Sequence, residues 1–129
     1  MVDLMRQITV PHAIDFMALT SYGAGARTSS GNIRMSMDLQ TNIENKNVLL
    51  VEDIVDTGFT TRYLLQNLAG RGPASLGICT LLDRTSRRIA RTPINYSCFE
   101  IPDRFVVGFG LDHKQLYRNL DCIAVIKPE

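Results

Sequence analysis

The residues best suited to chemistry lie within Val48–Thr61, where three carboxylates meet a Gly-Thr-rich turn. Glu52 and Asp53 end an apolar run, and Asp56 follows shortly after them. Two adjacent acids suit a divalent metal or the paired hydroxyls of a ribose. A glycine turn that opens a helix presents unpaired backbone N–H groups to an anion. The stretch therefore predicts a sugar-phosphate site, with the phosphate held by the N–H groups of Thr57, Gly58, Phe59 and Thr60.

Two other interpretations of this stretch stay open at this point. The acids could be solvated strand-end residues, with Thr57 or Thr60 capping a helix, which is the usual case for an isolated acidic pair. The run VLLVED also looks like the first strand of a phosphoacceptor receiver domain, with Asp83 and Lys127 as its other functional residues. The strand count between these residues and the turn fits a receiver domain poorly, so this is the minor alternative.

Alternating strand-like and helix-like segments surround the turn. Asn47–Val55 is a continuous apolar run, typical of a strand buried on both faces of a parallel sheet, and a helix is expected from the turn to Gly70. Further strands are expected in IDFMAL, IRMSMDL, ASLGICTLL, YSCFEI, FVVGFGL and CIAVIK, and a helix in VDLMRQI. This order predicts a single α/β domain over residues 1–129, in which ligands bind at the carboxyl ends of the strands.

The composition points to a small-molecule site rather than to a polyanion or a membrane. The 129 residues carry 14 basic and 13 acidic side chains and a net charge of +1, so no overall field favours nucleic acid or a lipid surface. No apolar run approaches the roughly 20 residues that cross a bilayer, and we expect a cytoplasmic protein. Cys79, Cys98 and Cys122 have no CxxC spacing and are expected to be reduced core residues.

The motif VEDIVDTGFT resembles the signature with which type I phosphoribosyltransferases bind phosphoribosyl pyrophosphate (PRPP). SYG at 21–23, LLDRTSRR at 81–88 and IPDRFVVGFGLDHKQLYRNL at 101–120 resemble the hypoxanthine-guanine branch, and the resemblance runs through essentially the whole chain from Val2. It implies a mainly parallel α/β sheet flanked by helices. It also implies transfer of the phosphoribosyl group from PRPP to hypoxanthine or guanine with Mg²⁺, giving IMP or GMP and pyrophosphate in purine salvage. A homo-oligomer, dimer or tetramer, is implied as well.

The resemblance assigns roles to the residues of the turn and of the purine site. Asp56 would be the general base or acid at N7 of the purine, and Glu52 and Asp53 would hold the ribose hydroxyls, directly or through Mg²⁺. Thr57, Gly58, Phe59 and Thr60 would cradle the 5′-phosphate. The purine would be bound by Arg84, by stacking on Phe105 and by the backbone of Val106.

The pyrophosphate and the lid are assigned in the same way. Asp112 would bind a second Mg²⁺ on the pyrophosphate, and Arg118 would neutralise that leaving group. Ser21 and Tyr22 would lie on a loop that closes over the site and excludes water from the reaction.

Two departures from the family pattern affect these expectations. Arg84 stands where the family usually has lysine, so the preference among hypoxanthine, guanine and xanthine is open. Relatives also carry an upstream strand and a Lys-Gly loop, whereas VDLMRQI looks like the end of the helix that follows them. We therefore expect an amino-terminal core strand to be missing and catalysis to be weakened, and a non-catalytic PRPP- or nucleotide-binding relative is the alternative.

Overall fold

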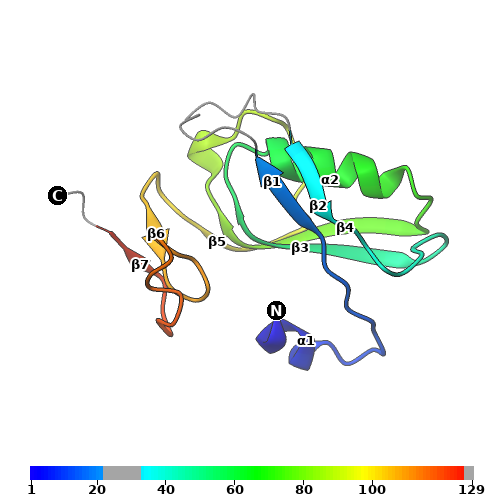
Figure 1. The fold of residues 1–129 in the computed structure, drawn as a ribbon, viewed down its shortest axis with the longest axis horizontal. Helices are drawn as coiled ribbons and strands as arrows, with labels where there is room; N and C mark the ends of the chain where they lie inside the picture. Colours follow the sequence, from blue (N-terminus) through cyan, green and yellow to red (C-terminus); the bar gives the residue numbers. More distant parts are fainter. Residues whose placement is uncertain (22–32, 127–129) are drawn as a thin grey trace.

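A parallel sheet forms the centre of the computed structural model, which describes residues 1–21 and 33–126 (Figure 1). Its strands are β3 (Asn47–Val55), β4 (Ser75–Asp83) and β5 (Tyr96–Glu100), in the order β3-β4-β5. Val55 pairs with Asp83, and Asp83 with Glu100, so the three strands end on one row. The turn identified in the sequence leaves the sheet at this row.

Helix α2 (Phe59–Ala69) connects β3 to β4 and covers one face of the sheet (Figure 1). Its buried residues Thr61, Leu64 and Leu68 are spaced by three and four, which places them on one side of the helix. They pack with the inner side chains of the sheet in a core whose least exposed members are Val55, Ile78, Thr80 and Leu82. Full burial of each such aliphatic side chain contributes about 1.5–3 kcal/mol, so this layer fixes the carboxyl ends of β3 and β4 in place.

The remaining elements are short and lie around this core. Helix α1 (Val2–Gln7) has no buried residue, and a 3₁₀ turn spans Thr85–Arg87 after β4. Two antiparallel pairs complete the fold, β1 (Ala18–Ser21) with β2 (Ile33–Met37) and β6 (Val106–Val107) with β7 (Ala124–Val125). In Figure 1 the β6–β7 pair lies beyond β5, at the side of the sheet opposite β3.

The predicted α/β fold with a parallel sheet is confirmed, and β3 has the expected bounds. IDFMAL does not form its strand from Ile14, because β1 begins only at Ala18. The carboxylate of Asp15 accepts hydrogen bonds from the backbone N–H groups of Gln40 and Thr41, both at 2.9 Å. These bonds hold the start of IDFMAL in the loop that precedes β1.

Three further expectations were wrong. FVVGFGL is a strand only at Val106–Val107, because Gly108, Phe109 and Gly110 have φ of 93°, 53° and 97° and turn the chain. CIAVIK pairs only at Ala124–Val125. The cysteines are free, as expected, but only Cys79 is in the core. Cys98 and Cys122 are exposed, Cys98 because the edge strand β5 is covered on neither face.

No helix in the described ranges is both long enough and apolar enough to cross a membrane.

Candidate functional site

The turn between β3 and α2, residues 55–58, is braced by the segment that follows β4, residues 84–92. Arg84 N–H donates to the carbonyl of Val55 at 3.0 Å. Ile89 and Ala90 both donate their N–H groups to the carbonyl of Thr57, at 3.0 and 2.9 Å. Nε of Arg88 donates to the carbonyl of Asp56 at 3.1 Å, so the carbonyl oxygens of Val55, Asp56 and Thr57 all point toward this bracing segment.

The N–H groups of the turn have the opposite orientation, because a trans peptide unit directs its C=O and its N–H to opposite sides. Gly58 is the N-cap of α2, with φ of 86° and no side-chain cap among the described residues, so neither Thr57 nor Thr60 caps the helix as the alternative interpretation supposed. Within the described residues, no acceptor binds the N–H groups of residues 57–60. Free donors at the start of a helix of this length form a site for an anion such as phosphate.

Glu52 and Asp53 lie on β3 just before the turn. Consecutive strand residues face opposite sides of the sheet, and accordingly Glu52 is half-buried while Asp53 is exposed. Burial raises the pKa of Glu52 to about 7, and the neighbouring negative charge of Asp53 adds to the rise. No cationic side chain pairs with either acid in residues 1–21 and 33–126. The pair therefore carries negative charge that a cation or a hydroxyl donor would compensate.

Asp56 and Arg84 each keep one buried polar atom without a partner. Oδ2 of Asp56 lies 3.3 Å from Nη1 of Arg84 and 3.5 Å from Nη1 of Arg87. Nη2 of Arg84 donates to the carbonyl of Arg104 at 2.6 Å. Oδ1 of Asp56 and Nε of Arg84 are buried and make no hydrogen bond with any residue that the structure describes. Leaving buried groups unpaired costs free energy, so this acceptor and this donor mark a place for a polar ligand.

Phe105 directly follows Arg104, whose carbonyl accepts the hydrogen bond from Arg84. Phe105 is 53% exposed, and its ring contacts the ring of His113 edge to face, with centroids 5.3 Å apart. Val106 is buried and pairs with Val125 in the β6–β7 sheet. An exposed aromatic ring held at one edge leaves a face on which a planar base can stack.

Asp112 and Arg118 form an ion pair with each other, and neither pairs with the acids of β3. Nη2 of Arg118 lies 2.9 Å from Oδ1 of Asp112, and the N–H of Gln115 donates to Oδ2 of Asp112 at 2.8 Å. The described part of the chain holds no cluster of three or more His, Cys, Asp or Glu. Asp112 follows β6 on a separate sheet, and so the structure does not gather it with the acids of β3 into one metal centre.

The proposed lid is only partly described. Ser21 is the last residue of β1, where its backbone pairs with Ile33. Tyr22 and Lys127, the latter from the receiver-domain alternative, lie outside the described residues.

The sequence analysis missed Arg88, and it considered Asp83 only as a residue of the receiver-domain alternative. Asp83 ends β4, and its carboxylate forms a largely buried ion pair with the guanidinium of Arg88. Nε of Arg88 also donates to the carbonyl of Asp56 at 3.1 Å. The only available signal was an acid at the end of a predicted strand followed by several arginines, a pattern that does not say which arginine turns inward.

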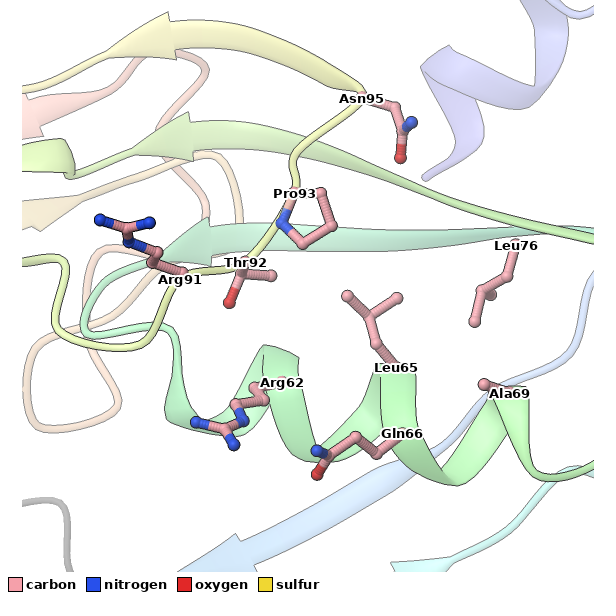
Figure 2. A pocket seen from close by; sticks show the side chains of 9 residues that line it. All are labelled: Arg62, Leu65, Gln66, Ala69, Leu76, Arg91, Thr92, Pro93 and Asn95. Carbon is pink, nitrogen blue, oxygen red and sulfur yellow. The ribbon is translucent and has the colours of Figure 1, made fainter.

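A groove of about 390 Å³ lies behind the turn, between α2 and the segment that leads into β5 (Figure 2). Leu65 and Pro93 point into its middle, while Arg62 and Arg91 lie toward one end. Thr92, which also lines the groove, donates its hydroxyl to the carbonyl of Gly58 at 3.4 Å. The groove is thus on the carbonyl side of the turn, away from the free N–H groups.

Comparisons with known proteins agree on one family. The model of the phosphoribosyl transferase domain matches residues 1–114. A hypoxanthine phosphoribosyltransferase of Haemophilus influenzae is 48% identical over 126 residues, and a hypoxanthine-guanine phosphoribosyltransferase of Streptococcus mutans is 42% identical over 129. These alignments cover 98% and 100% of this chain and 70% and 71% of the relatives. The relatives are therefore longer than the chain.

Solved structures give the same result. A hypoxanthine phosphoribosyltransferase from Staphylococcus aureus superposes with a TM-score of 0.92 at 43% identity, covering 98% of this chain and 68% of that one. A ternary substrates complex of the enzyme from Trypanosoma cruzi, in a lysine-to-arginine mutant, superposes with a TM-score of 0.90 at 42% identity, with coverage of 98% and 69%.

Proposed function

The chain belongs to the phosphoribosyltransferase family, in its hypoxanthine-guanine branch, and from this membership we propose that it transfers the phosphoribosyl group of PRPP to hypoxanthine or guanine. The products are IMP or GMP and pyrophosphate, and the reaction serves purine salvage. The observation that carries the proposal is the turn of residues 55–58, in which the bracing segment binds the carbonyls of Val55, Asp56 and Thr57 while no described acceptor binds the N–H groups of residues 57–60. We assign the 5′-phosphate of PRPP to the N–H groups of Thr57, Gly58, Phe59 and Thr60.

The purine is assigned to the unpaired atoms beside the turn. A 6-oxopurine offers a proton on N7 and an oxygen on C6, which match the free acceptor Oδ1 of Asp56 and the free donor Nε of Arg84. Stacking on the exposed ring of Phe105 and contact with the backbone of Val106 would orient the base. Asp56 is then the general base that removes the N7 proton as N9 forms its bond to C1′.

Glu52 and Asp53 are assigned to the ribose hydroxyls and to a divalent cation, for which Mg²⁺ is our choice. Both acids lack a cationic partner among the described side chains, and their carboxyl oxygens fit the cation because Mg²⁺ prefers hard oxygen ligands. When bound, the cation would supply neutralisation of the pyrophosphate charge. A second Mg²⁺ at Asp112 and leaving-group contact by Arg118 rest on the resemblance, and both need the ion pair between these side chains to open.

The same carboxylates would favour the reaction electrostatically. Departure of pyrophosphate from C1′ builds positive charge on the ribose, and a nearby negative side chain stabilises that charge more in the transition state than in the substrate. Ser21 and Tyr22 are proposed for the lid that excludes water, from the resemblance alone. The free thiols of the three cysteines support a reducing compartment, and we propose the cytoplasm.

The test is nucleotide formation by the purified chain. PRPP and Mg²⁺ are supplied with hypoxanthine, guanine or xanthine in turn, and nucleotide and pyrophosphate are measured together. The proposal requires equal amounts of both products with hypoxanthine or guanine. Binding of PRPP without any product would instead favour a non-catalytic relative.

A further inference from the structure

We propose that Arg88 is a positioning residue for phosphate binding, and that with Asp83 it orients the N–H groups of the turn. The inference rests on the proposed function, because it assigns the 5′-phosphate to these N–H groups. It adds a residue that touches neither the phosphate nor the base.

One guanidinium reaches three points around the turn. Nε of Arg88 donates to the carbonyl of Asp56 at 3.1 Å, and Nη2 lies 3.4 Å from the carbonyl of Val55. Nη2 also pairs with the carboxylate of Asp83 at the end of β4. The side chains of Arg88 and Asp83 are only 17% and 11% exposed, so these contacts are made largely out of water.

The carbonyl of Asp56 and the N–H of Thr57 belong to the same planar peptide unit. A hydrogen bond that fixes the carbonyl on the side of Arg88 therefore fixes the N–H of Thr57 on the opposite side, where the phosphate is proposed to bind. The next unit is held in the same way, by the bonds of Ile89 and Ala90 to the carbonyl of Thr57. Among the described donors that bind the carbonyls of the turn, Arg88 is the only charged one. Hydrogen bonds from a charged donor are stronger than those between neutral groups.

The arrangement depends on the shape of the guanidinium. Its planar fork directs Nε and Nη2 along different lines, toward the turn and toward Asp83, whereas an ammonium group is a single compact donor. The stem of Arg88 also fills the space beside Gly58, since a Cβ placed on Gly58 would meet Cδ of Arg88 at 2.9 Å. Lysine would keep the charge and lose this geometry.

The experiment compares Arg88→Lys with the double change Asp83→Asn/Arg88→Gln, which removes both charges and leaves no buried ion unpaired. Arg91→Gln is the matched control, because Arg91 is exposed and forms no ion pair in the described part of the chain. Thermal unfolding is measured first. Inorganic phosphate is then titrated while the amide resonances of Thr57 and Gly58 are followed by NMR, and KM and kcat are measured for PRPP and hypoxanthine.

We expect both Arg88 variants to fold, to bind phosphate about tenfold more weakly and to raise the KM for PRPP similarly, with little change in the KM for hypoxanthine. Arg91→Gln should match the wild type. Folded variants that bind phosphate and PRPP like the wild type would overturn the inference. Variants that unfold before phosphate is added would overturn it too, since Arg88 would then belong to the fold alone.

Failure of the proposed function is recognisable separately. A wild-type chain that responds to phosphate but forms no nucleotide would refute the reaction and leave the phosphate comparison decisive for Arg88. A wild-type chain whose turn amides ignore phosphate would refute the phosphate site and the role of Arg88 together.

Discussion

Glu52 combines burial, a charged neighbour and the absence of a cationic partner among the described side chains, and it therefore links the site to pH. Its pKa in the folded chain is about 7, above the ordinary 4.5. Between pH 4.5 and pH 7, Glu52 keeps a proton in the folded chain that it has lost in the unfolded chain. The free energy of unfolding therefore falls as the pH rises through this range. A bound cation, or hydrogen bonds from ribose hydroxyls, would stabilise the charged carboxylate of Glu52 and so reduce this loss of stability.

The predicted effect is measurable in the ligand-free chain. The free energy of unfolding should fall by up to about 3 kcal/mol between pH 4.5 and 7, with less if the half-buried carboxyl remains partly hydrated. Glu52→Gln should remove this part of the slope, because the amide does not titrate. Denaturant unfolding at a series of pH values checks it, and an identical slope in both proteins would contradict the assignment.

Individual site residues could be predicted from the sequence where they belong to one contiguous motif. Glu52, Asp53 and Asp56 were singled out from their spacing alone. The pairing of Asp83 with Arg88 was not predictable, because it depends on how a loop folds back across the end of the sheet. The same is true of the contact of Arg84 with Asp56, which joins the residues that directly follow β4 and β3.

The element that organises the site is the turn from β3 into α2, and Gly58 is its critical position. Its φ of 86° is unfavourable for other residues, and a Cβ would lie 2.7 Å from the carbonyl oxygen of Ala90. Gly110 offers a matched control, because its φ of 97° is equally left-handed but a Cβ there would meet nothing within 4 Å.

Gly58→Ala should therefore cost more than Gly110→Ala. Backbone strain of about 1–2 kcal/mol is common to both, and the clash with Ala90 adds to it only at Gly58. Phosphate and PRPP binding should fall in Gly58→Ala, because relief of the clash moves the turn. Unfolding free energies and phosphate titrations measure this, and equal losses in the two variants would count against the close packing of the turn.

Elements with a strong pattern could be predicted, and those set by backbone conformation could not. The apolar run of β3 gave its bounds directly. FVVGFGL has an equally apolar pattern, yet positive φ at three consecutive residues limits β6 to two residues. Phe109 is among them, and its type gives no warning of a left-handed conformation.

At the scale of the molecule, the sheet is covered unevenly. β5 is exposed along its length, with Tyr96 63% and Phe99 61% exposed, and it forms the edge of the sheet. An unpaired edge strand beside exposed aromatic side chains is a surface suited to association. We therefore propose β5 as the contact, with a second copy as partner, of the homo-oligomer that the family resemblance implies.

Replacing Tyr96 and Phe99 together by serine should shift the chain toward the monomer at micromolar concentration. Ile89→Ser is the control, because Ile89 is 68% exposed but lies outside β5. Sedimentation velocity over a range of concentrations measures the distribution. The placement fails if the wild type is monomeric throughout, or if the double variant associates as the wild type does.

The central claim is that this chain forms a nucleotide from PRPP and a purine with Asp56 as the base, and one comparison tests it most directly. Nucleotide formation with hypoxanthine is measured for the wild type, for Asp56→Asn and for Arg62→Gln, a change in the groove behind the turn. We predict that Asp56→Asn lowers kcat by about 10²–10⁴-fold with a smaller effect on PRPP binding, and that Arg62→Gln stays near the wild type. Nucleotide formed equally well by Asp56→Asn, or none formed by the wild type with any base, would contradict the account.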